Sequence, residues 1–292
     1  SDLIVAHDGS VYLADSQTNQ ILLIDSEGRL AKTIGQGGAG PGEFARPSSL
    51  VQLGDTLAVV DLGNGRLQFL SLTGEPLGTM SLPPGMAPPA VGSSLFFVSP
   101  TWGTDSVLAI IRGRDGSIRG RIGTIEGAPS NLIRLSELKA EIQEGRVPGI
   151  FMNTAQAAVG PAGTIWLTVP ARASVERFDS MGVSQWSVVL EDSAFDGVRT
   201  HWIAMNAAAE MNQLLSLRYI LDVQSVGGDL WVLLGQSLVG PATIRVIKAD
   251  GSFGARITFT YVTGTGQFAV DVERRRVYFA RPETAELLGA SF

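Results

Sequence analysis

The sequence contains no cysteine and only two histidines, His7 and His201. The absence of cysteine excludes disulfide bonds, thiolate catalysis, iron–sulfur clusters and cysteine-ligated zinc. Two histidines are too few for a zinc site with three histidine ligands, and neither has another ligand type at a telling spacing. We expect His7 to lie in a solvated loop and His201 to pack or cap within a helical segment.

Charged residues are also scarce, at 17% of the 292 residues against about a quarter in an average soluble domain. The formal net charge is −6. Nucleic acids and anionic membrane surfaces are bound through basic patches, so neither is an expected partner. No run of eighteen apolar residues occurs, and the chain is therefore expected to have no transmembrane segment of its own.

What the sequence does contain is a repeated pattern, in which a small, polar or charged pair precedes four or five mostly apolar residues. Five of the six residues at the fourth position of this pattern are aromatic, although aromatic residues make up only 7% of the chain. Short runs rich in aromatic and β-branched residues indicate strands rather than helices. The six segments are 9–15, 55–61, 93–99, 163–169, 228–234 and 275–281, with Tyr12, Ala58, Phe96, Trp166, Trp231 and Tyr278 at the fourth position.

Each of these predicted strands has a short strand before it, and in the first five units two more strands follow it across tight turns. Four short strands joined in this way form an antiparallel meander. Six such units predict an all-β protein, a six-bladed β-propeller of four-stranded antiparallel blades that forms a single domain over residues 1–292. The sixth unit has one strand fewer, and we expect its missing strand to come from residues before Ser1 or from another chain.

Two intervals between the repeated strands are long, 70 residues from Ser99 to Val169 and 65 from there to Leu234. A propeller blade takes roughly 40–50 residues, so each interval must carry an insert. The inserts are expected at about 124–152, with a helix over 135–142, and at about 191–216, with a helix within 198–215. Alternating strand direction predicts that both inserts and the glycine-rich joint at 35–44 share one face of the propeller.

The glycine-rich joint and two of the turns carry a specific resemblance. The joint reads GQGGAGPGEF, with Pro47 three places on, and the turns read Asp15-x-x-x-Asn19-Gln20-Ile21 and Asp61-x-x-Asn64-Gly65-Arg66-Leu67. Over residues 1–81 this pattern resembles NHL-type repeats, with Gln20 where arginine is usual, and from about 82 onward the resemblance is at the level of fold. The chain looks like the exported six-bladed propellers of bacteria, which implies a periplasmic or secreted location.

From the residues alone, the joint and its turns are best explained as structural. Glycine permits positive φ and close backbone approach, while proline limits the freedom of the joint. The side chains of Asp15, Asn19, Asp61 and Asn64 are expected to accept hydrogen bonds from turn N–H groups.

Reactive chemistry has few candidates in this sequence. A calcium site in the central channel would need several oxygen ligands, and the first strands offer only Asp222, Asp271 and a few glutamines, namely Gln52, Gln156 and Gln224. Asp222 and Asp271 are therefore weak metal candidates, and no cofactor is expected. A G-x-S-x-G nucleophile elbow and a phosphate-binding loop before a helix are both absent.

We therefore predict a non-enzymatic protein-binding or scaffold propeller, an accessory subunit that stabilises a larger extracytoplasmic or membrane-anchored complex. Interface centres favour tryptophan, methionine and arginine, so the predicted partner-binding residues lie in the two inserts. They are Leu138 and Ile142 in the first insert and Arg199, Trp202 and Met205 in the second. The alternatives are a metal-dependent lactonase or strictosidine-synthase-like hydrolase, as the resemblance allows, and a receptor for a small molecule or glycan.

Overall fold

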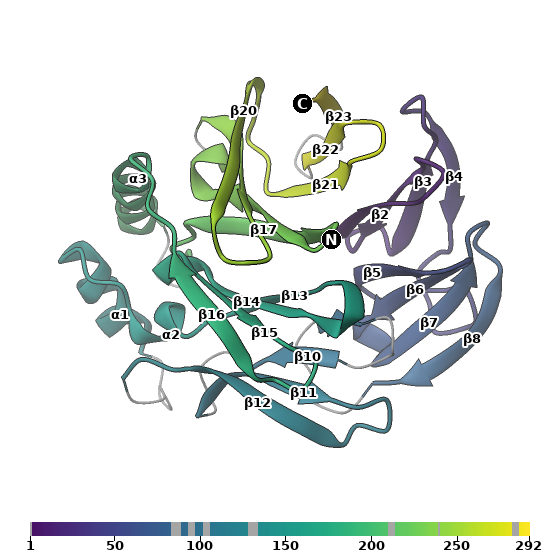
Figure 1. Ribbon diagram of the computed structural model, residues 1–292, viewed down its shortest axis with the longest axis horizontal. Coiled ribbons are helices and arrows are strands. Elements are labelled where there is room, and N and C mark those ends of the chain that lie inside the picture. The colour runs from purple at the N-terminus through teal and green to yellow at the C-terminus, as the bar shows by residue number, and fades with distance from the viewer. Residues whose placement is uncertain are drawn as a thin grey trace. The chain divides into compact units, whose positions relative to one another are not determined.

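The computed structural model describes residues 2–82, 89–92, 97–101, 106–127, 134–209, 214–238, 240–281 and 286–292. Strands make up about half of this part of the chain, and helices are few (Figure 1). Within it, none of the helices has the length and apolar character that crossing a bilayer requires.

The strands form six antiparallel sheets, and within each sheet neighbouring strands are consecutive in the sequence. Five sheets have four strands, and the sixth has three among the residues described, as expected from the sequence. The first two sheets are β1 (Asp2–Val5), β2 (Val11–Asp15), β3 (Gln20–Ile24) and β4 (Leu30–Ile34), then β5 (Pro47–Leu53), β6 (Thr56–Asp61), β7 (Arg66–Ser71) and β8 (Pro76–Ser81). The next two are β9 (Ala90–Val91), β10 (Phe97–Pro100), β11 (Val107–Arg112) and β12 (Ile118–Thr124), then β13 (Gln156–Val159), β14 (Ile165–Val169), β15 (Ser174–Phe178) and β16 (Ser184–Val189). The last two are β17 (Ile220–Val226), β18 (Asp229–Leu234), β19 (Pro241–Ile247) and β20 (Phe253–Thr263), then β21 (Gln267–Asp271), β22 (Arg276–Arg281) and β23 (Glu286–Ser291).

The second strand of each sheet supplies much of the core. Every residue of β14 is buried, and all but the first residue of β6 and β18, whereas the outermost strands β4 and β8 are almost wholly exposed. A strand covered on both faces is uniformly apolar, which explains the runs seen in the sequence. The described members of the aromatic column are all buried, and Phe96, with the rest of 93–96, lies outside the described residues.

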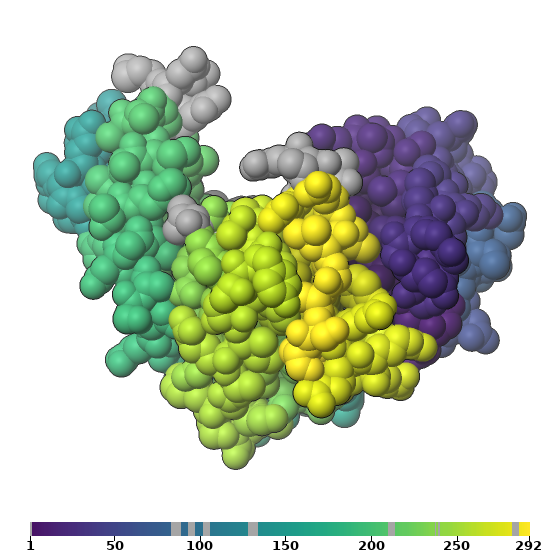
Figure 2. All heavy atoms as spheres, turned by 90° about the horizontal axis from the view of Figure 1, so that it is seen from above, coloured from purple at the N-terminus to yellow at the C-terminus, as the bar shows by residue number. Residues whose placement is uncertain are grey.

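The chain divides into two compact units. Unit 1 comprises residues 1–93 and 265–292, and unit 2 comprises 94–264. In unit 1 the C-terminal sheet packs beside the N-terminal one, with Leu3 of β1, Ala269 of β21 and Tyr278 of β22 in one core cluster. The yellow C-terminal strands accordingly lie beside the purple N-terminal ones in Figure 2.

Unit 2 carries the helices of both inserts, α1 (Leu135–Gln143), α2 (Gly149–Met152) and α3 (Phe195–Ala208). The structure confirms the helix expected over 135–142, while the single turn α2 was not predicted. Helix α3 begins three residues earlier than predicted and ends at Ala208, because Ala209 has an extended ψ of 148°. Glu210 and Met211, which were expected to prolong it, lie outside the described residues.

Candidate protein-binding surface on the helical inserts

The two inserts of unit 2 join into one helical cluster, with α1 and α3 side by side at the left of Figure 1. Its core contains Ile142 of α1 and Val198 and Trp202 of α3, with Phe151 and Met152 of α2 packed against them. The rings of Phe151 and Trp202 meet edge to face at 6.4 Å between centroids. This small core gives the inserts their own apolar support.

Polar contacts lock the inserts to one another. The Lys139 ammonium of α1 donates to the Ala209 carbonyl at 2.9 Å, and the Arg199 guanidinium of α3 donates to the Gly145 carbonyl. The indole N–H of Trp202 donates to the Leu215 carbonyl at 2.6 Å. The first two bonds connect the two inserts and satisfy backbone carbonyls just beyond helix ends, while the third lies within the second insert.

The first insert is held to the fourth sheet by Arg172, which lies in the 3₁₀ turn Pro170–Arg172 between β14 and β15. Its guanidinium donates to the carbonyls of Met152 and Thr124 and to Oδ1 of the buried Asn153, and it forms an ion pair with Glu126 at 3.3 Å. The Asn153 amide also bonds the backbone of Glu126 in both directions. Burial lowers the pKa of Arg172, although Glu126 opposes this effect.

The second insert is held to the fifth sheet by Asp192, just before α3. Its carboxylate accepts a hydrogen bond from the Ala194 N–H at 3.0 Å and forms an ion pair with Arg256 of β20 at 3.0 Å. Burial acts to raise the pKa of Asp192, but the bonds from Arg256 and Ala194 outweigh it and keep that pKa below its usual value. Both ends of the helical cluster are therefore fixed to sheets of unit 2.

The structure separates the five predicted partner-binding residues into two groups. Trp202 and Ile142 are only 4% and 1% exposed, so these two hold the cluster together and present almost no surface. Arg199 and Met205 are exposed and Leu138 is half-buried, which leaves these three accessible. Whether any of the five binds a partner stays a prediction.

Hydrophobic spacing predicts that Trp202, Met205 and Ala209 share one face of this helix, and that register was wrong. The buried positions are Val198, Trp202 and Asn206, at four-residue steps, whereas Met205 is 43% exposed. Asn206 is buried because its side-chain amide bonds both the N–H and the carbonyl of Leu215. A polar residue that satisfies a returning chain segment is not recognisable from hydrophobic spacing alone. His201 is exposed on the same helix, so its expected packing was also wrong.

Two further accessible apolar residues of the inserts were not predicted. Leu135, at the first position of α1, is 38% exposed, and Leu215, after α3, is 46% exposed. The sequence predicted Leu135 as the first residue of a helix but gave no sign that its side chain would be accessible. It gave no such sign for Leu215 either. We refer to these two residues, together with Met205 and the half-buried Leu138, as the insert surface.

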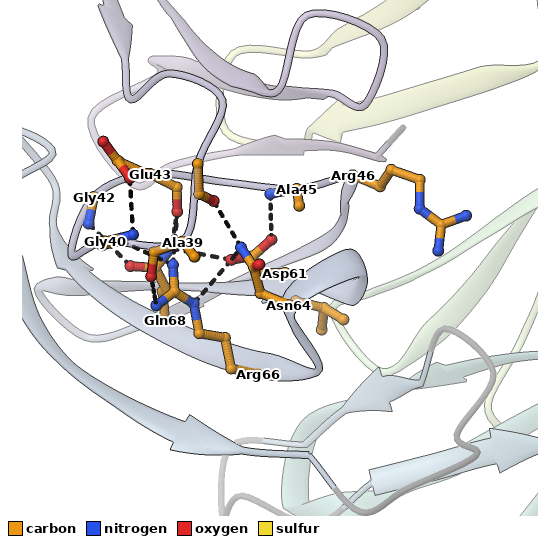
Figure 3. Close-up of polar contacts among 12 residues, drawn as sticks. Ala39, Gly40, Gly42, Glu43, Ala45, Arg46, Asp61, Asn64, Arg66 and Gln68 are labelled. Carbon is orange, nitrogen blue, oxygen red and sulfur yellow. Dashed lines mark hydrogen bonds and ion pairs between the residues drawn. The ribbon is translucent and has the colours of Figure 1, made fainter.

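The glycine-rich joint of unit 1 is a closed polar network around Asp61 (Figure 3). The buried Asp61 carboxylate accepts hydrogen bonds from the Ala45 N–H at 2.7 Å and the Arg66 guanidinium at 2.9 Å. Arg66 donates in addition to three carbonyls of the joint, and Gln68 donates to one of these, that of Glu43. The structural interpretation of the joint is confirmed, since these side chains bond the chain's own backbone.

The other turn residues of this resemblance also bond nearby groups of the chain. Asn19 accepts the Arg46 N–H at 2.8 Å, as expected, whereas Asn64 acts as a donor, from its amide nitrogen to the Gly38 carbonyl and to Asp61, and not as the expected acceptor. Among the residues that the structure describes, Asp15 bonds only within its own turn, to Gln17 and Thr18. Within unit 1 the joint therefore lies against both turns, as the alternation of strand direction predicts.

The weak metal candidates are engaged in local contacts. Asp271 of β21 is 5% exposed, accepts the Arg274 N–H and forms an ion pair with the Arg274 guanidinium at 3.1 Å. Asp222 of β17 accepts the Val223 N–H at 2.9 Å. Among the residues that the structure describes, no three histidine, aspartate or glutamate side chains are grouped so that they could hold a metal ion. His7 is exposed in its loop, as expected.

Comparison with known proteins supports the fold. A family described as "6-bladed beta-propeller" (DUF5128) matches residues 1–90. Of the curated protein sequences, none is similar to this chain. The sheet topology and the matching family define the chain as a six-bladed β-propeller with four-stranded antiparallel blades.

Many solved structures are similar at low sequence identity. A putative exported protein from Bacteroides fragilis has a TM-score of 0.56 at 11% identity, over 96% of this chain and 78% of that one. A member of the DUF4221 family from Bacteroides vulgatus has a TM-score of 0.56 at 9% identity, over 100% and 93%. Virginiamycin B lyase from Staphylococcus aureus has a TM-score of 0.52 at 11% identity, over 98% and 78%. At these identities the likeness concerns the fold alone.

Proposed function

We propose that this protein is a non-enzymatic protein-binding propeller, and that its insert surface contacts the partner. The observation that carries the proposal is the exposure of Leu135 on α1, Met205 on α3 and Leu215 in the segment after α3, around a helical cluster that has its own buried core. Apolar side chains that the local core does not need are available for a second protein. Methionine also adapts its shape to a partner surface at little cost.

The build of the helical cluster supports the same proposal. The bonds of Lys139 and Arg199 between the inserts, and those of Arg172 and Asp192 to the sheets, hold the surface in one conformation before binding. A preorganised surface loses less conformational entropy on association and therefore binds more tightly for the same contact area.

For the location, we propose an extracytoplasmic protein that acts as an accessory subunit of a larger extracytoplasmic or membrane-anchored assembly. The support is the resemblance of residues 1–81 to exported bacterial propellers and the description of one structural neighbour as a putative exported protein.

The test is capture of a partner from native membrane and soluble fractions by the tagged full chain. The Leu135→Glu/Met205→Glu double variant should lose at least about 90% of the captured partner, because burying two carboxylates in an apolar interface is costly. The matched control is Leu30→Glu/Leu77→Glu, which changes two leucines of unit 1 that are 61% and 60% exposed.

Wild type and control should retain the partner, and circular dichroism should show that all three proteins are folded. Equal capture by the insert variant, or a wild-type chain that remains a lone monomer in every fraction, would overturn the proposal. No feature of the described residues favours the hydrolase or the small-ligand receptor over this function.

A further inference from the structure

Asn64 is the only asparagine in the sequence that is followed by glycine. In such a pair the backbone nitrogen of the glycine can attack Cγ of the asparagine side chain, because glycine has no Cβ to hinder the approach. A bond forms between this nitrogen and Cγ, and the side-chain nitrogen takes up the displaced proton and leaves as ammonia. Water then opens the succinimide ring to aspartate or isoaspartate, so the net reaction consumes one water and releases one ammonia.

Hydrogen bonds, and not bulky neighbours, restrain this reaction in the folded turn. Gly65 is exposed, and a Cβ added to it would meet no atom within 4 Å. The side-chain nitrogen of Asn64 donates to the Gly38 carbonyl and to Oδ2 of Asp61, both at 2.8 Å. The Gly65 N–H donates to the Leu62 carbonyl at 3.2 Å. The Asn64 side chain can therefore turn towards the Gly65 nitrogen only when its own two bonds have broken.

We propose that Asn64 is a site of spontaneous deamidation, and that the reaction is controlled by the glycine-rich joint and in turn weakens it. The Gly38 carbonyl belongs to the joint, and the Asp61 carboxylate also accepts the N–H of Ala45, the residue that follows the joint. Movement of the joint away from the turn thus breaks the bonds that hold Asn64. A reaction that requires a rapid local opening proceeds in proportion to the population of the open form.

The product should destabilise the closed joint because Asn64 acts as a donor in both of its bonds, whereas an aspartate carboxylate only accepts. Deamidation would place a second carboxylate beside that of Asp61 and would leave the Gly38 carbonyl without this donor. Repulsion between like charges and an unsatisfied carbonyl are both unfavourable. Each molecule that deamidates therefore keeps a weakened joint.

Asn19, in the equivalent turn of the first sheet, provides a matched control for the effect of the product. It is followed by Gln20, and its side-chain oxygen accepts the Arg46 N–H at 2.8 Å, a role that aspartate can also fill. Asn64→Asp should lower Tm by about 4–8 °C, whereas Asn19→Asp should change it by less than about 2 °C. Equal Tm values for Asn64→Asp and wild type would overturn the proposed effect on the joint.

Control by the joint is tested by incubating the full chain in mildly alkaline buffer and following the peptide that contains Asn64 by mass spectrometry. In wild type, Asn64 should deamidate faster than the other asparagines. Asp61→Ala, which removes one restraint and loosens the joint, should raise the rate at Asn64 at least about tenfold. If Asp61→Ala does not fold, Asp61→Asn serves as the milder variant.

The control is Asn153→Ala, which destabilises unit 2 and should leave the rate at Asn64 within about twofold of wild type. Equal rates in wild type and the folded Asp61 variant would overturn the proposal, as would faster deamidation of another asparagine in wild type. An increase in Asn153→Ala as large as that in the Asp61 variant would show that the reaction follows general unfolding and would also overturn control by the joint.

Discussion

In each unit an arginine bonds the backbone of a segment that leads into a sheet. The two arginines differ in their position relative to the turn and in the other side chains that they bond. In unit 1, Arg66 is the first residue of β7, with one residue between it and the 3₁₀ turn Leu62–Asn64, and it bonds the carbonyls of the joint that leads into the second sheet. In unit 2, Arg172 lies inside the corresponding turn of the fourth sheet and bonds the carbonyls of Thr124 and Met152, at either end of the first insert. Each arginine lies in or next to the turn between the second and third strands of its sheet.

The two arginines differ in the charge and burial of the side chains that they bond. Arg66 is paired with Asp61, whose side chain is 0% exposed, whereas Arg172 is paired with the half-exposed Glu126 and with the neutral Asn153. In both sheets a guanidinium bonds several backbone carbonyls near this turn, but its position in the sequence differs between the two sheets. Guanidinium suits the task because its five donors can reach several carbonyls at once.

The largest expected effect comes from removing the acid of unit 1. Asp61→Ala should lower the free energy of unfolding by about 3–5 kcal/mol, because it leaves Arg66 with an uncompensated charge in a largely buried site. Urea denaturation measures this. The control is Asp15→Ala, at the equivalent turn of the first sheet, where the carboxylate has no arginine partner among the described residues. Equal losses in the two variants would show that the Asp61 network does not hold the joint.

A smaller effect is expected from the neutral partner in unit 2. Asn153→Ala should cost about 1–3 kcal/mol, since it leaves the backbone groups of Glu126 unsatisfied while Arg172 keeps its carbonyl partners. The same urea measurement applies, with the exposed Gln185→Ala as a control near zero. If Asn153→Ala lowers the free energy of unfolding as much as Asp61→Ala does, the charge of the arginine's partner does not decide how much each site contributes to stability.

The smallest effect concerns the turn itself. Gly65 has φ 61°, and a Cβ added there would meet no atom within 4 Å, so Gly65→Ala isolates the backbone cost of about 1 kcal/mol. Its counterpart in unit 2 is Ala173, which has φ 52°. Gly78→Ala, equally open but without positive φ, should be neutral in the same thermal or urea titration. A neutral Gly65→Ala would mean that the turn relaxes to another conformation.

Most strands could be predicted because their signals are local. Buried runs such as 165–169 and 229–234 alternate with turns, and they fall within one or two residues of the expected segments. The Asp61 turn could likewise be assigned, since Asp61, Asn64 and Arg66 are within five residues of one another. Arg172 could not, because the atoms that it binds are 19 to 48 residues away.

The candidate binding surface shows the same limit. Trp202 and Ile142 were predicted to bind a partner because they are large apolar residues of the inserts. Residue type alone cannot distinguish the core of a small helical cluster from its outer face. That distinction depends on how α1 and α3 pack, which in turn depends on contacts such as Lys139 with Ala209.

Local signals in the sequence specify the kind of protein, six like-built antiparallel units with two helical inserts, because hydrophobic spacing and turn residues act over a few neighbours. The folded structure was needed to show which side chains of the inserts are accessible and which arginine bonds the segment that leads into the second and the fourth sheet. These features arise from contacts between distant parts of the chain, whose geometry depends on the packing of the sheets and helices.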